Sequence, residues 1–292
     1  MIINPYVAGG TWLKGCLHAH TENSPCGHYP LEKVIGMYMS YGMEYDFLAI
    51  TDHFSLTEIG KTAGDGKLIL FQGVEYKRAK FQMLGININK YDDDKDNSNN
   101  HQDIIDEVKR QGGFTIICHP HLNAGDYWPI EKLKGLNGYL GIEIYNNNVR
   151  LNNSGRAVAT DVWDELLSSG KRVFGFANDD MHIFSRVGGA YNMVLSPEKS
   201  KESIINSIKK GSFYASSGVI FDSIAVIGDM ISVRIKRIPG EIRFIGTGGK
   251  VLKSTSGMGA DYVYSGSESY VRVEVRREDG AMAWTQPFYK TE

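Results

Sequence analysis

Five short, mostly apolar runs constrain this chain more than any other feature of its sequence. They cover residues 12–17, 47–51, 68–74, 114–118 and 173–177. Apolar runs of this length are typical of strands buried on both faces, as in a parallel sheet. The residues that follow these runs include side chains that can bind metal ions, namely His18, His20, His53, Glu75, His119, Asp180 and His182.

The pair His18 and His20 directly follows the first run. Side chains on an extended strand alternate between its two faces, so two histidines separated by one residue point to the same side. Neutral imidazole is a common ligand of zinc, manganese and iron. One such pair is a weak signal, because each histidine could equally be a satisfied core or helix-capping residue. The repetition of ligand-type residues at five strand ends argues against that alternative.

The stretches between these runs have the periodicity of helices. Pro30 opens a segment with one apolar face, and Gly112 ends another. Ser196 and Pro197 form a capping pair that predicts the start of a further helix, which ends near Lys209-Lys210-Gly211. Buried strands that alternate with helices predict an α/β fold. Ligands at the carboxyl ends of the strands are typical of the active site of a β/α barrel.

From residue 219 the pattern changes to that of an antiparallel β structure. Apolar and polar residues alternate at 231–235 and 271–275, and Asp279-Gly280 is a turn-forming pair. We therefore predict a catalytic barrel over residues 1–218 and a small, sandwich-like β-domain over residues 219–292. For the second domain, packing or oligomer contacts are favoured over carbohydrate binding.

The order of the motifs resembles that of the PHP (polymerase and histidinol phosphatase) phosphoesterases. The motifs are His18-x-His20, Thr51-Asp52-His53, Gly73-Val74-Glu75, His119-Pro120 and Asp180-x-His182. The resemblance implies a distorted (β/α)7 barrel, similar to a TIM barrel, with one to three divalent metal ions at the carboxyl ends of its strands. Zinc, manganese and iron are the expected ions.

The resemblance also implies which residues bind each ion. The ligands implied for the first ion are His18, His20, Glu75 and Asp180. Glu75 would bridge to a second ion that His119 also binds. His53 and His182 would hold a third.

Two positions depart from the pattern of the family. Many members have a histidine where this chain has Gln82, and an amide is a poorer ligand than imidazole for zinc-like ions. An aspartate or histidine usually follows the second histidine by five or six residues, where this chain offers Cys26. We expect Cys26 to be a thiolate ligand, with a small residue in a tight loop as the alternative.

Three further residues are candidates for supporting roles. Asp52 is expected to orient a ligand or receive a proton rather than bind metal. Arg186 could grip a phosphate, or it could be a surface arginine. Glu143 ends a short apolar stretch and could support the site from behind or serve the fold alone.

Composition narrows the class of function. The net charge of −2 provides no basic footprint for nucleic acid, and no apolar run approaches membrane-spanning length. Three cysteines form no obvious disulfide framework, and no signal peptide is recognisable, so we expect a cytoplasmic protein. Oligomer formation stays open.

These observations predict a metal-dependent phosphoesterase that acts on a small-molecule phosphate ester. One alternative is an amidohydrolase-like enzyme, although we find no candidate for the carboxylated lysine that such barrels usually have. Another is a non-catalytic metal-binding or regulatory module.

Overall fold

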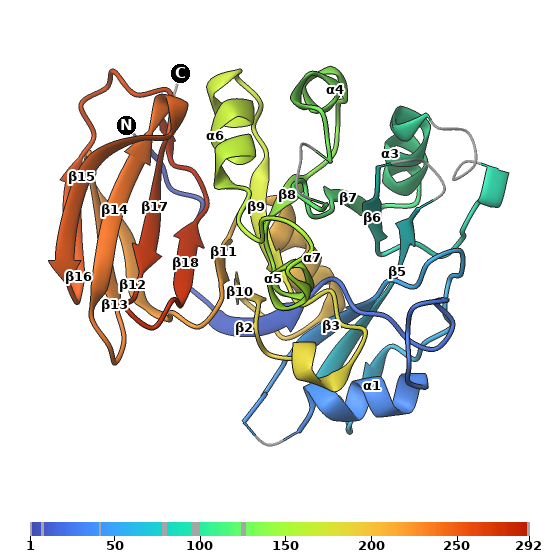
Figure 1. Ribbon diagram of the computed structural model, residues 1–292. Helices are drawn as coiled ribbons and strands as arrows, with labels where there is room; N and C mark the ends of the chain where they lie inside the picture. The colour runs from blue at the N-terminus through green and yellow to red at the C-terminus, as the bar shows by residue number, and fades with distance from the viewer. Residues whose placement is uncertain are drawn as a thin grey trace.

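One long mixed sheet runs through the protein (Figure 1). The computed structural model describes residues 2–6, 9–40, 42–77, 81–94, 100–123 and 127–290. In spatial order the strands of the sheet are β15 (Lys250–Gly257), β14 (Gly240–Gly246), β17 (Val271–Arg276), β18 (Met282–Thr285), β11 (Phe213–Ser216), β10 (Tyr191–Ser196), β2 (Thr11–Cys16), β3 (Phe47–Ile50), β5 (Leu68–Tyr76), β6 (Met83–Ile86), β7 (Phe114–Ile117), β8 (Gly141–Asn146) and β9 (Phe174–Asn178). A short strand, β4 (Thr62–Ala63), pairs with β5 off this path.

The strands that precede the ligand-type residues form two parallel groups. β2, β3 and β5 are parallel to one another, and so are β7, β8 and β9. β6 separates the groups because it is antiparallel to both β5 and β7. The five apolar runs correspond to β2, β3, β5, β7 and β9, and β3 and β7 are buried along their whole length. The prediction of a mixed α/β fold with buried parallel strands is confirmed.

A closed (β/α)7 barrel is not confirmed. The hydrogen-bonded path of strands ends at β9 instead of returning to β2. Beyond these two strands the chain segments meet through a bridge between Ala19 and Met181. The side chain of Asn178 also accepts a hydrogen bond of 3.0 Å from the Leu17 backbone. The regular alternation of strand and helix is interrupted as well, because the fully described residues 51–67 join β3 to β5 without a helix.

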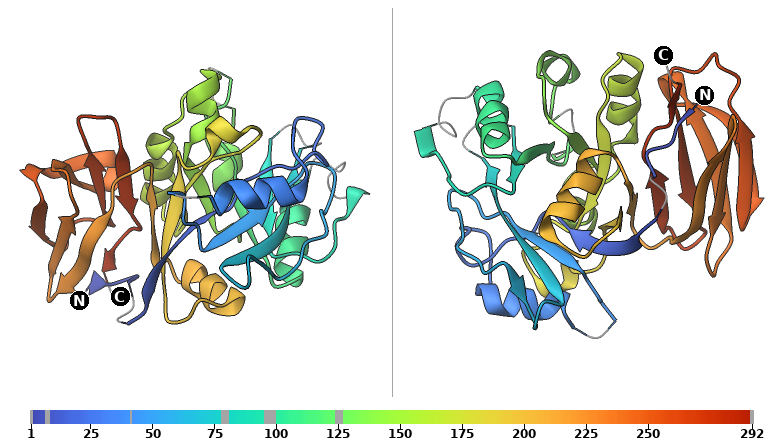
Figure 2. Two further views of the ribbon diagram at one scale, coloured as in Figure 1. Left: turned by 90° about the horizontal axis from the view of Figure 1, so that it is seen from below. Right: turned by 180° about the vertical axis from the view of Figure 1, so that it is seen from behind.

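The helices surround the parallel part of the sheet. Those that the structure describes in full are α1 (Leu31–Tyr38), α3 (His101–Arg110), α4 (Ile130–Gly135), α5 (Asn147–Asn152), α6 (Thr160–Ser168) and α7 (Lys201–Lys209), with short 3-10 turns η1 (Phe184–Arg186) and η2 (Thr247–Gly249). α5 lies on the face seen in Figure 1, whereas α7 covers the opposite face (Figure 2).

The predicted start of the last helix is wrong. Ser196 belongs to β10, where it pairs with Thr11, and α7 starts at Lys201. The side chain of Ser200 provides the N-cap by accepting a hydrogen bond from the Ser203 backbone. The strand pairing therefore outweighs the local capping signal at Ser196.

The C-terminal part is a two-layered antiparallel structure. A small sheet of β12 (Phe221–Ile227), β13 (Met230–Ile235) and β16 (Gly259–Val263) packs against β14 and β17. The alternating apolar residues expected here are fully buried between the layers, among them Val233, Phe244 and Val273. β18 pairs with β11, so the large sheet continues from the first part of the chain into the second. β1 (Ile2–Ile3) pairs with β19 (Tyr289–Lys290), which places both ends of the described chain side by side.

Candidate metal centre

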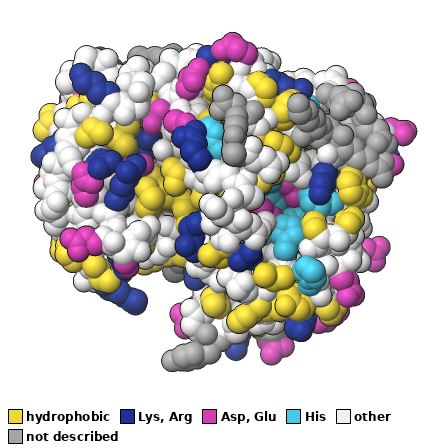
Figure 3. Space-filling view, viewed as in Figure 1, with side chains coloured by type: hydrophobic (Ala, Val, Ile, Leu, Met, Phe, Trp, Pro, Cys, Tyr) yellow, Lys and Arg dark blue, Asp and Glu magenta, His cyan; other side chains and the backbone are white. Residues whose placement is uncertain are grey.

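The strand ends bring seven predicted ligands to one place. His18 and His20 follow β2, His53 follows β3, Glu75 lies near the end of β5, His119 follows β7, and Asp180 and His182 follow β9. His18 and His20 are fully buried, whereas the side chain of His182 is 19% exposed. Histidine side chains gather beside acidic ones on the face seen in Figure 3, so the centre opens toward solvent there.

Four of these residues form a compact set that we call the inner group: His18, His20, Glu75 and Asp180. The Nε2 atom of His18 lies 3.2 Å from Nε2 of His20, 3.2 Å from Oε2 of Glu75 and 3.2 Å from Oδ1 of Asp180. Nε2 of His20 lies 3.3 Å from the same oxygen of Glu75 and 3.4 Å from that of Asp180. Bonds of 2.0–2.1 Å to a tetrahedral zinc ion would place its ligand atoms about 3.3–3.4 Å apart. The inner group therefore has the spacing of a metal site.

The hydrogen bonds behind the two histidines determine where their ring protons lie. Nδ1 of His18 is 2.7 Å from Oε1 of Glu143, and Nδ1 of His20 is 2.9 Å from the Ser24 hydroxyl. That hydroxyl gives its own proton to Asp52, at 2.8 Å, so it must accept from His20. Because both Nδ1 atoms donate, the neutral rings turn their Nε2 lone pairs toward the carboxylates.

The inner group thus contains acceptors that face each other and need a cation between them. Among the described residues, Oδ1 of Asp180 has no hydrogen-bond partner, although it is buried. Burial raises the pKa of Glu75 and of Asp180, but the neighbouring imidazoles outweigh it and hold both pKa values well below the usual range. A divalent ion, or protons on the imidazoles, would balance these negative charges. The residues present therefore fit the metal that the motifs imply.

Asp52 lies behind the inner group. Its carboxylate accepts hydrogen bonds from the backbone and hydroxyl of Thr21, each at 2.6 Å, and from the hydroxyls of Ser24 and Thr57. It reaches His20 through Ser24. This position fits an orienting role for Asp52.

Glu143, on β8, accepts hydrogen bonds from two of the predicted ligands. Oε1 accepts from His18 and, at 3.0 Å, from Asn178, while Oε2 accepts from the His119 backbone and from Asn146, each at 2.9 Å. Its side chain is fully buried. The sequence allowed two roles for Glu143, support of the site or support of the fold alone. In the structure its carboxylate lies against His18.

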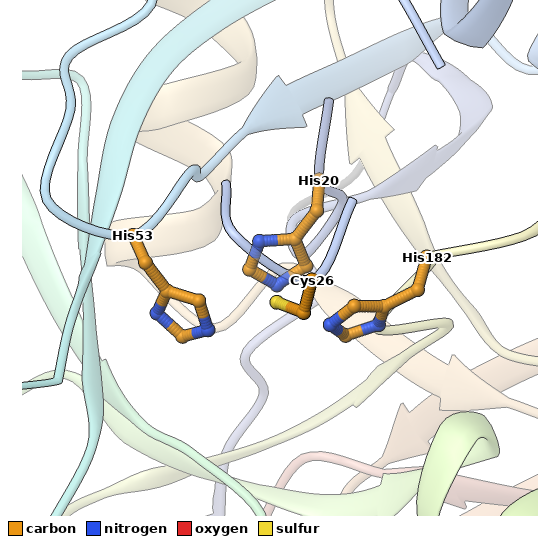
Figure 4. A group of neighbouring side chains, drawn as sticks. All are labelled: His20, Cys26, His53 and His182. Carbon is orange, nitrogen blue, oxygen red and sulfur yellow. The ribbon is translucent and has the colours of Figure 1, made fainter. Parts of the chain in front are cut away.

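Three more side chains near the centre form a second set, which we call the outer group: Cys26, His53 and His182 (Figure 4). Their ligand atoms lie within 4.8 Å of one another and of a ring nitrogen of His20. Nδ1 of His182 lies 2.9 Å from the Asp180 carbonyl, and Nδ1 of His53 lies 3.3 Å from the Glu75 carbonyl. Both contacts leave Nε2 as the ligand atom. Burial lowers the pKa of His53 to about 4, which favours the neutral, metal-binding form of its ring.

The second predicted ion would lie near His119. Nε2 of His119 is 3.1 Å from Oε1 of Glu75, the carboxylate oxygen that does not face the inner group. The amide oxygen of Gln82 accepts a hydrogen bond of 3.0 Å from the Tyr127 hydroxyl, and the Tyr127 ring lies 5.7 Å from that of His119. Gln82, which stands where many members of the family have a histidine, is therefore hydrogen-bonded to Tyr127.

Asn146 and Asn148 are site residues that the sequence analysis missed. Each donates a hydrogen bond of 3.3 Å to Oδ2 of Asp180. Asn146 is the last residue of β8 and Asn148 lies in the following helix α5, so the pattern of polar residues at strand ends could have found them. Arg186 donates from Nε to Oδ1 of Asn148 at 3.1 Å, so its guanidinium lies one side chain away from Asp180.

The backbone is strained at two of the predicted ligands. Asp180 has φ of 52° and His119 has φ of 25°, values that residues other than glycine rarely adopt. Such conformations persist where the surrounding structure holds them, often at functional sites.

The similarity of this chain to known proteins is a similarity of fold. The sequence matches no protein-family model and no curated protein. A two-domain protein from Bacteroides vulgatus that contains a predicted PHP-like metal-dependent phosphoesterase is similar over 98% of each chain, with a TM-score of 0.54 and 15% identity. PsfC from Pseudomonas syringae matches 68% of this chain and 87% of its own, with a TM-score of 0.45 and 14% identity. The lesion-specific endonuclease PfuEndoQ from Pyrococcus furiosus matches 68% of this chain and 56% of its own, with a TM-score of 0.42 and 14% identity.

No helix among the described residues is long and apolar enough to cross a membrane. The likeness to the Bacteroides vulgatus protein extends over nearly the whole chain. The resemblance to PHP-like phosphoesterases that the order of the motifs indicates is therefore shown at the level of the fold.

Proposed function

We propose that this protein is a metal-dependent hydrolase of phosphate esters whose substrate is a small molecule. The observation that carries the proposal is the inner group, in which two imidazole lone pairs and two carboxylate oxygens converge at 3.2–3.4 Å. The net charge of −2 argues for a small anionic substrate rather than a long polyanion.

The chain's own residues would prepare this centre for hydrolysis. The inner group would hold one divalent ion, and Glu143 and Ser24 would keep the lone pairs of His18 and His20 directed at it. A bound divalent ion would polarise a phosphoryl oxygen and lower the pKa of a water molecule. Asn146 and Asn148 would hold the Asp180 carboxylate in position through its other oxygen.

Arg186 is our candidate for a contact to the phosphate. It is half-buried, and its link to Asn148 places the guanidinium beside the centre. A guanidinium can bind two phosphate oxygens with parallel hydrogen bonds. Asp52 would act through Ser24 and His20, so we assign it a positioning role.

The test is reconstitution followed by substrate profiling. Protein freed of metal with a chelator would be reloaded with Mn²⁺, Zn²⁺ or Fe²⁺ and assayed on p-nitrophenyl phosphate, a panel of small phosphate esters, single- and double-stranded DNA, and amide or lactone substrates. We expect turnover of small phosphate esters. Cleavage of DNA alone would move the protein to a nuclease, and turnover of amides alone would move it to an amidohydrolase.

Asp180→Asn provides the sharpest variant for this assay. It keeps the shape of the side chain but removes the negative charge that faces both imidazoles, so we expect turnover to fall by several orders of magnitude. Circular dichroism should be unchanged, because the core consists of apolar strands. Glu278→Gln, at an exposed turn of the β-rich part, is the control that should keep full activity. Near-normal turnover by Asp180→Asn on the best phosphate ester would refute the proposed mechanism.

A further inference from the structure

The outer group differs in chemistry from the inner group. The inner group provides two carboxylates and two imidazoles, whereas the outer group provides one thiol, on Cys26, and two imidazoles. His20 is near both groups, but its Nε2 lies 3.2–3.4 Å from three ligand atoms of the inner group and its Nδ1 binds Ser24. Nε2 of His53 also lies 3.2 Å from Oε2 of Glu75, so Glu75 borders both groups. Cys26, His53 and His182 are therefore the candidate ligands that the outer group adds to those of the inner group.

The loop that carries Cys26 is built tightly enough to hold the thiol in place. The Gly27 backbone donates to the Ser24 carbonyl at 3.0 Å, and the Ser24 backbone donates to the Thr21 carbonyl at 3.1 Å. Gly27 packs so closely against this turn that an added Cβ would lie 1.8 Å from the Thr21 oxygen. The Ser24 hydroxyl also accepts a hydrogen bond of 2.9 Å from the His53 backbone, which ties the loop to a second member of the outer group.

We propose that the outer group is a thiolate site, selective for zinc and other thiophilic ions, beside an inner site that accepts harder ions such as manganese. Thiolate ligands favour zinc over manganese, whereas carboxylates accept both. Three protein ligands and one open position are typical of catalytic zinc sites. On binding, the Cys26 sulfur would exchange its proton for the ion, and the proton would pass to solvent.

The inference rests on the proposed function for the presence of metal in this centre, but not on the reaction. It makes the two sites distinguishable by spectroscopy, because cobalt bound by a thiolate has a near-ultraviolet charge-transfer band that cobalt bound by nitrogen and oxygen lacks. It also implies that the protein binds zinc and manganese together, one in each site.

The experiment is a Co²⁺ titration of the metal-free, full-length protein. We expect the charge-transfer band to appear, and Zn²⁺ to remove it by displacement. Cys26→Ser should lose the band and about one equivalent of bound zinc, measured by elemental analysis, while keeping the visible cobalt bands of the inner site. Cys26→Asp should restore an equivalent of metal without the band and shift the preference of that site from zinc toward manganese.

The other two cysteines serve as controls. Cys118 is buried within 4.8 Å of ligand atoms of Glu75 and His119, so it is the competing thiol, and Cys16 is buried in the core outside all of these groups. Cys118→Ala and Cys16→Ala should both keep the band. A band that survives Cys26→Ser, or cobalt binding by the wild type without a band, would overturn the inference. A clear band in a protein with no phosphoesterase activity would overturn only the proposed function.

Discussion

Replacing Glu143 by glutamine should weaken metal binding without removing any ligand. The carboxylate accepts four hydrogen bonds, from His18, His119, Asn146 and Asn178, and it donates none. In Glu143→Gln one oxygen becomes an amino group, which faces either His18 and Asn178 or the His119 backbone and Asn146. In either orientation the new amino group, which is itself a donor, faces two groups that donated hydrogen bonds to the carboxylate.

The size of the effect follows from what His18 must do in response. If the new amino group faces Nδ1, the ring proton moves to Nε2, the atom that belongs to the inner group. Loss of an outer partner of a metal-bound histidine typically costs 10–100-fold in metal affinity, which is about 1.4–2.8 kcal/mol. We expect an effect near the upper end of this range, because Glu143 also holds the backbone of His119.

Competition against a chromophoric chelator would measure the dissociation constant of the inner site. The matched control is Glu274→Gln, another buried carboxylate, which accepts hydrogen bonds from Trp284 and Arg276 on the far strands β17 and β18. Both variants should lower the free energy of unfolding of the metal-free protein, but Glu143→Gln alone should raise Kd. A Kd within twofold of the wild type for Glu143→Gln would refute the argument from proton position.

Three further outcomes are expected. Gln82→His, combined with Tyr127→Phe, should raise the amount of bound metal, because the second change frees residue 82 from its hydrogen bond. Metal analysis that shows no gain would mean that residue 82 does not face the centre. Burial lowers the pKa of His18, but the neighbouring carboxylates outweigh burial and raise that pKa well above its usual value. The protonated ring therefore stabilises the folded protein fully below about pH 6.5, and this stabilisation is lost as the pH rises through the raised pKa. The Tm of the metal-free protein should therefore fall above that pH while the Tm of the loaded protein changes less, and a rising Tm of the metal-free protein would contradict this. Arg272→Met should cost about 3–5 kcal/mol in urea unfolding, because it leaves the buried Asp164 carboxylate without its partner at 2.6 Å, with activity per folded molecule unchanged; a cost below 1 kcal/mol would show that the pair is not needed.

The sequence by itself determined the strands and most of the ligand-type residues at their ends. The stretch 47–50 is apolar throughout because β3 is buried on both faces, and His53 follows because the strand ends at the centre. In the same way, alternation at 271–275 predicted the β17 strand, whose apolar residues are buried. These signals are local, because the residues that form each pattern belong to the same strand that the pattern predicts.

Tertiary structure decided the supporting contacts and the form of the sheet. The proton positions on His18 and His20 depend on Glu143 and Ser24, which reach them from another strand and from a loop. Whether Ser196 capped a helix depended on its pairing with Thr11, a residue far away in the sequence. The sheet does not close from β9 onto β2 because β10 pairs with β2 along the edge that faces away from β3. In each case the deciding partner comes from a distant part of the chain, and no local pattern records which distant residues folding brings together.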